Sequence, residues 1–147
     1  MNLFDTLAIS GSALLAERER SEIIAANMAN AETTHTEAGG PFHRREVVFE
    51  SPGASAFRLA LARSDLGAPV PGSVRISQVV DDPSPAIMRY QPGHPDANKS
   101  GYVAYPAINP AAEMVDLMGS VRAYQLNASA VSATKQMIQQ SIEILKS

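Results

Sequence analysis

The sequence predicts an α+β chain in which long N- and C-terminal helices pack as a coiled-coil-like pair or bundle and flank a small β-rich, loop-rich central insert. All ten prolines among the 147 residues lie between Pro41 and Pro110, which leaves both ends free to form unbroken helices. Apolar residues recur at steps of three and four in the two ends, whereas short runs in the middle alternate between apolar and polar residues. We therefore expect an N-terminal helix within residues 1–34, an insert at 35–109 and a C-terminal helix at 110–147.

The C-terminal helix has the clearer pattern. Asn109 and Pro110 form a helix-start signal, in which a capping side chain precedes a proline at the first helical position. Beyond them only Gly119 is unfavourable for a helix. Nine of the ten residues reached by steps of three and four are apolar or aromatic, and polar residues fill positions between them. These ten residues are Met114, Leu117, Val121, Tyr124, Ala128, Val131, Lys135, Ile138, Ile142 and Leu145.

The N-terminal helix follows the same steps with a weaker pattern. Six of its nine seam positions are apolar, and small residues are dense between Ala8 and Ala13, which would let another helix approach closely. The nine positions are Leu3, Leu7, Ser10, Leu14, Glu17, Ser21, Ile24, Met28 and Ala31.

Two asparagines, Asn27 and Asn30, lie three residues apart near the predicted end of this helix and share one face of it. Asn30 could simply end the helix, or the two amides could form hydrogen bonds between packed helices. The pattern alone leaves both interpretations open.

Short alternating runs predict strands in the insert. They begin near Val47, Phe57, Val74 and Met88. Turn signals separate these runs at Gly39-Gly40, Pro52-Gly53, Pro71-Gly72 and Pro92-Gly93.

Each terminal helix needs a partner. Burying one seam side chain stabilises the fold by at most about 1.5–3 kcal/mol, and a helix alone in water cannot gain it. The partner is either the other end of the same chain or another copy, and the periodicity does not distinguish them.

Composition and motifs exclude several classes of function. The chain has no cysteine, and its net charge of −3 argues against a general nucleic-acid binder. The apolar run from Leu3 to Ala16 has no positive leader and is shorter than the roughly 20 residues that span a bilayer, so we expect neither a cleaved signal peptide nor direct membrane insertion. His35, His43 and His94 have no metal-ligand spacing. We expect no catalytic residues, no metal and no cofactor.

Segments at both ends resemble the flagellar axial proteins. Residues 26–33, Ala-Asn-Met-Ala-Asn-Ala-Glu-Thr, are similar to the signature that ends the N-terminal helix in that family, and residues 113–127 with 135–137 are similar to its C-terminal helix. In the insert, residues 41–50, 90–97 and 101–106 resemble flagellar basal-body rod proteins of the FlgC type.

This resemblance implies a non-enzymatic structural subunit of the proximal rod in the bacterial flagellar basal body. Such a subunit is exported by the flagellar type III apparatus without a cleaved signal, and it assembles with copies of itself and other rod proteins into a hollow, torque-transmitting shaft across the periplasm. A soluble helical adaptor that pairs its own two ends, or another rod subunit of the same family, is the alternative.

The terminal helices are then the expected assembly interface. On the C-terminal helix we expect it at Met114, Leu117, Val121, Tyr124, Val131, Ile138, Ile142 and Leu145. On the N-terminal helix we expect it at Leu3, Leu7, Leu14, Ile24, Asn27, Met28 and Asn30.

Overall fold

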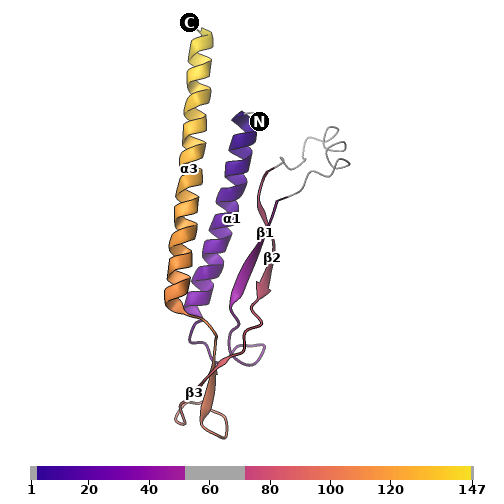
Figure 1. Cartoon of the computed structure of the whole chain (residues 1–147), viewed down its shortest axis with the longest axis vertical. Helices are drawn as coiled ribbons and strands as arrows, with labels where there is room; N and C mark the ends of the chain where they lie inside the picture. The colour runs from indigo at the N-terminus through magenta and orange to yellow at the C-terminus, as the bar shows by residue number, and fades with distance from the viewer. Residues whose placement is uncertain (1–2, 52–71, 147) are drawn as a thin grey trace, which may run out of the picture. The chain divides into compact units, whose positions relative to one another are not determined.

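The structure, a computed structural model, describes residues 3–51 and 72–146 and confirms the α+β class (Figure 1). Long helices stand at both ends, and two small two-stranded sheets lie between them in sequence. The elements are α1 (Leu3–Ala29), β1 (Arg45–Glu50), β2 (Arg75–Asp81), β3 (Ile87–Tyr90), β4 (Tyr102–Tyr105) and α3 (Pro110–Lys146).

Three of the four predicted strands are confirmed as β1, β2 and β3. The strand predicted to begin near Phe57 lies outside the described residues. β4 is not predicted by the pattern, because its residues, Tyr-Val-Ala-Tyr, carry no alternation of apolar and polar side chains.

The start of α3 has the predicted cap, and both terminal helices are long. The Asn109 Oδ1 accepts a hydrogen bond from the Ala111 N–H at 3.0 Å, which confirms the predicted cap of α3. With 27 residues in α1 and 37 in α3, the helices are about 40 Å and 55 Å long.

The chain divides into two compact units, and each contains part of both helices. The first comprises residues 1–19, 48–78 and 120–147, and the second comprises residues 20–47 and 79–119. Within the second unit, the Asn27–Glu113 hydrogen bond joins the C-terminal end of α1 to the N-terminal end of α3.

In the first unit, the start of β2 is attached to α1. The Ser12 hydroxyl accepts a hydrogen bond from the Val74 N–H at 3.0 Å and donates one to the Ile9 carbonyl at 2.7 Å. Arg75 pairs with Glu50 of β1 at 2.8 Å. The buried helical residues of this unit are small: Ser10 and Ala16 on α1, and Ser120 and Thr134 on α3.

In the second unit, β3 and β4 form an antiparallel pair with Ile87 opposite Tyr105 and Tyr90 opposite Tyr102. Val103 is fully buried, and Tyr105 is 7% exposed. The Tyr105 hydroxyl hydrogen-bonds the Gln91 side chain at 2.7 Å, so the one polar atom of this ring has a partner.

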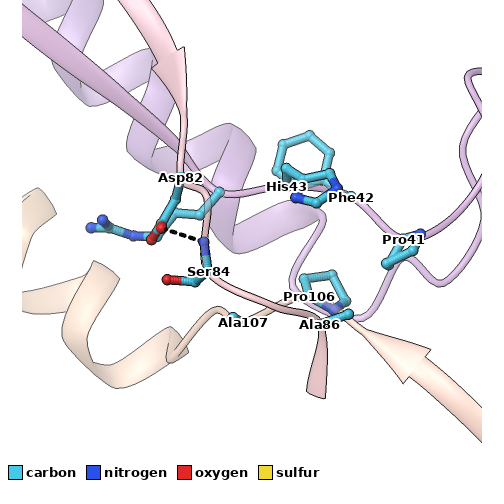
Figure 2. A pocket seen from close by; sticks show the side chains of 9 residues that line it. Pro41, Phe42, His43, Asp82, Ser84, Ala86, Pro106 and Ala107 are labelled. Carbon is cyan, nitrogen blue, oxygen red and sulfur yellow. Dashed lines mark hydrogen bonds between the residues drawn. The ribbon is translucent and has the colours of Figure 1, made fainter. Parts of the chain in front are cut away.

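An irregular segment, residues 82–86, joins β2 to β3 (Figure 2). The Ser84 N–H donates to the Asp82 carboxylate at 2.8 Å, and the hydrogen bonds from Ser84 lower the pKa of Asp82. Beside this segment is a hollow of about 10 Å³ lined by residues such as Phe42, His43 and Pro106, enough for about one water molecule.

A buried polar cluster connects α1, the start of β1 and α3. Asn27 is 1% exposed, and its side-chain amide forms three hydrogen bonds. Its Oδ1 accepts from the Arg45 N–H at 2.9 Å, and its Nδ2 donates to the Arg45 carbonyl at 2.8 Å, as a residue of a neighbouring strand would. The same Nδ2 donates to the Glu113 Oε2 at 3.1 Å. One side chain thus fixes a strand and a second helix.

Arg44 completes the cluster from the other side of Glu113. Its Nε donates to the Glu113 Oε1 at 2.5 Å, and its guanidinium also pairs with Glu46 and with Asp116. The hydrogen bond to Glu113 is the main cause of a raised pKa for Arg44. Glu113 is only 1% exposed, and its charge is balanced in place because Asn27 and Arg44 each bind one oxygen.

We predict that Asn27→Ala destabilises the chain by about 2–4 kcal/mol, because the Arg45 backbone and Glu113 lose buried hydrogen bonds. Urea unfolding of the purified chain measures this change. Asn127→Ala is the matched control, since the Asn127 amide only donates to the Ala123 carbonyl of its own helix and should cost less than about 0.5 kcal/mol. Equal effects of the two substitutions would contradict the role of Asn27.

We also predict that Gly101→Ala weakens the β3–β4 pair by about 1–3 kcal/mol. Gly101 has a φ of +80°, and an added Cβ would stand 2.8 Å from Cε2 of Tyr90. Gly93→Ala is the control, because an added Cβ there meets nothing within 4 Å. The same unfolding measurement should separate the two variants, and a Gly101→Ala chain as stable as its control would refute the argument.

Candidate assembly surface

The face of α3 that contacts its own chain is built from small or polar side chains. Glu113, Ser120 and Thr134 are the buried residues of this helix, each at most 2% exposed. They follow one another at intervals of seven and fourteen residues, so they share one helix face. Small or polar side chains thus occupy the buried face of α3, and the large apolar residues of this helix lie elsewhere.

The eight residues predicted as the α3 interface stand beside this contact face rather than on it. None is buried within the chain: Leu117, Val131 and Ile138 are half-buried, and the others are exposed. The exposed fractions are 44% for Met114, 44% for Val121, 42% for Tyr124, 46% for Ile142 and 86% for Leu145. The side chains at the predicted interface are therefore largely accessible to another molecule.

Five further large apolar residues of α3 are exposed and were not predicted. The exposed fractions are 68% for Val115, 64% for Met118, 65% for Leu126, 47% for Met137 and 74% for Ile144. The single register of threes and fours that predicts the interface passes over these positions. Counting eleven residues at a time from Val115 reaches both Leu126 and Met137, and this spacing was the signal that could have found them.

The residues predicted as the interface on α1 include buried ones, unlike those on α3. Ile24 and Asn27 are buried in the chain, Leu7, Leu14 and Met28 are half-buried, and Leu3 is 37% exposed. The most exposed large apolar residues of α1 are Phe4 at 66% and Leu15 at 70%, neither of which was predicted.

Within the chain, the side chain of Asn30 forms only local hydrogen bonds. Its Nδ2 donates to the Ala26 carbonyl at 2.9 Å, and its Oδ1 accepts from the Thr33 hydroxyl at 3.1 Å. Both partners are within four residues, because α1 ends at Ala29 and its last carbonyls need donors. Asn30 therefore ends the helix, whereas Asn27 bonds across helices to Glu113 within the same chain.

The described part of the chain offers little for chemistry. Residues 3–51 and 72–146 contain no group of three or more histidine, aspartate or glutamate side chains placed to bind a metal ion. Within the same ranges, no helix combines the length and apolar character needed to cross a membrane.

A family model and several known proteins match this chain. The family model for the flagellar basal body rod FlgEFG protein C-terminal region matches residues 99–144, which include β4 and most of α3. The FlgC flagellar basal-body rod protein of Bacillus subtilis is 36% identical over 99% of this chain and 100% of its own length.

Two other relatives carry the same name. The FlgC protein of Borreliella burgdorferi is 32% identical over 99% of both chains, and that of Yersinia enterocolitica is 33% identical over 98% of this chain and 96% of its own. These matches confirm the resemblance stated from the sequence and agree with a structural, non-enzymatic component of the basal-body rod. The chain belongs to the FlgC family of flagellar basal-body rod proteins.

Proposed function

We propose that this chain is a structural subunit of the proximal rod that self-assembles through α1 and α3 into a hollow, torque-transmitting shaft across the periplasm. The observation that carries the proposal is the exposure of large apolar side chains along α3. Soluble monomers rarely expose an extended apolar surface without a partner for it.

The exposed apolar residues of α3 extend over most of its length. Each contributes about 1.5–3 kcal/mol when fully buried, although association itself costs several kcal/mol. They are Met114, Val115, Met118, Val121, Tyr124, Leu126, Met137, Ile142, Ile144 and Leu145. A surface of this length suits partners that present long helices of their own, which copies of this chain and other rod proteins would do.

The helices also suit a load-bearing shaft. α3 runs for 37 residues as one continuous helix, with proline only at its first position. A wall of such helices, packed side by side, would resist twisting because its apolar contacts run along the whole length of each subunit.

Delivery through the flagellar type III export apparatus, without removal of a leader, is part of the proposal. The apolar run from Leu3 to Ala16 belongs to α1, and Ser10 and Ala16 within it are buried in the folded chain. Removing this run would take away half of α1, so it is better understood as part of the subunit than as a cleavable signal.

An adaptor that pairs its own two ends remains the second candidate. The Asn27–Glu113 hydrogen bond favours it, because it joins α1 to α3 within one chain. The two candidates differ in what they require of the exposed face of α3: a rod subunit needs this face for assembly, and a self-paired adaptor does not.

We predict that Val121→Glu abolishes rod assembly and leaves the free subunit folded. Val121 is 44% exposed, so a glutamate there should change the stability of the free chain by less than about 0.5 kcal/mol. In a subunit interface the same carboxylate would be buried without a partner. The measurement is motility and basal-body imaging of a deletion strain that expresses the variant, with thermal melting of the purified chain.

Val121→Ile is the matched control, because it keeps the apolar contact and should support normal rods. Normal motility with Val121→Glu would count against assembly through this face and in favour of the adaptor. A deletion strain with intact rods would reject the rod function itself.

A further inference from the structure

We propose that α1 of one copy docks antiparallel against α3 of a second copy, with Leu15 opposite Leu126 and Glu19 opposite Arg122. This inference rests on the proposed rod function and specifies which surfaces meet and in what register. The residues that carry it all belong to the first compact unit.

The α3 half of the contact is a stripe with two large residues and two small ones. Leu126 and Met137 are 65% and 47% exposed, and they lie eleven residues apart, which is about three helical turns. Between them, on the same side of the helix, stand Ala130 and Ala133.

The α1 half has the same spacing in the reverse direction. Leu15, which is 70% exposed, lies eleven residues after Phe4, and Ala8 and Gly11 stand between them. When the two helices run antiparallel with Leu15 at Leu126, the small residues match as well: Gly11 falls at Ala130 and Ala8 at Ala133. Large residues thus form the ends of the contact, and small residues let the two backbones approach between them.

Gly11 is the residue that the isolated chain does not explain. A Cβ added at Gly11 would meet nothing within 4 Å, so packing within the chain does not require glycine there. Glycine in the middle of a helix is unfavourable relative to alanine. A close approach by a helix from another copy gives this glycine a purpose.

The charges next to the stripe are complementary in the same register. Glu19 lies one turn after Leu15 on α1, and Arg122 lies one turn before Leu126 on α3, so antiparallel docking places opposite charges at one level. Both residues are exposed. The alternative register, with Leu15 opposite Val115, lacks the match of small residues, because Gly119 and Arg122 stand between Val115 and Leu126.

The contact joins two different surfaces, and every copy carries both of them. Such a head-to-tail contact leaves one free surface on each side of every pair, so it repeats from copy to copy. Repetition of this kind builds a closed ring or a helical tube, which is the form that a hollow rod requires.

Charge exchange tests the register in cells. A deletion strain is complemented with wild-type chain, with Glu19→Arg, with Arg122→Glu, and with both changes together. Each single change places like charges opposite each other and should reduce the number of basal bodies by at least about tenfold. The double variant restores opposite charges and should recover most of that loss.

Cysteine cross-linking tests the contact directly, because the natural chain has no cysteine. Leu15→Cys and Leu126→Cys chains are expressed together, and their isolated basal bodies are oxidised. A disulfide-linked dimer should form only when both variants are present. Leu15→Cys with Val115→Cys is the control for register and should give no dimer.

The outcomes separate this inference from the function on which it rests. If the wild-type chain fails to restore rods to the deletion strain, the rod function is rejected. If wild type restores rods, the docking is overturned by normal rods with either single charge variant, by a double variant that recovers nothing, or by cross-linking at Val115 in place of Leu126.

Discussion

The composition of the buried faces of α1 and α3 is the constraint on which the rest of the structure depends. The residues buried on these helices are mostly small or polar, such as Ser10, Ala16, Ser120 and Thr134, so burial within the chain uses few of the larger apolar side chains. Those larger side chains, Leu126 and Val121 among them, are consequently left on the surface. Folding of the single chain therefore buries few large apolar side chains and gains little hydrophobic free energy from α3. Association with other chains could bury the remaining ones and gain much more, which would couple folding to assembly.

The buried polar cluster fixes the position of α1 relative to the start of α3. An apolar core tolerates sliding of one helix along another, but the Asn27 amide has only one position in which it satisfies the Arg45 backbone and Glu113 together. Arg44 neutralises the buried Glu113 carboxylate from the opposite side. We regard the cluster as a device for specificity more than for net stability, because burying charged groups offsets much of what their pairing contributes.

Much of the fold could be predicted from the sequence, because the relevant signals are local. The confined prolines and the Asn109–Pro110 cap define α3, and alternation defines β1, β2 and β3. β4 was missed because a strand buried mainly through Val103 and Tyr105 need not alternate in polarity. The choice of contact face could not be predicted, since it depends on which of several periodic stripes meets the partner helix. Arg44 and Glu113, 69 residues apart, come together only through the tertiary fold.

The central claim is that the exposed apolar side chains of α3 are buried by neighbouring subunits in the rod. A density map of isolated basal bodies, at a resolution that shows side chains, measures this most directly. We expect Val121 and Leu126 to be enclosed by helices of adjacent subunits, while Glu113 keeps its contacts with Asn27 and Arg44 of its own chain. A map in which Val121 and Leu126 face the lumen or the solvent would contradict the account.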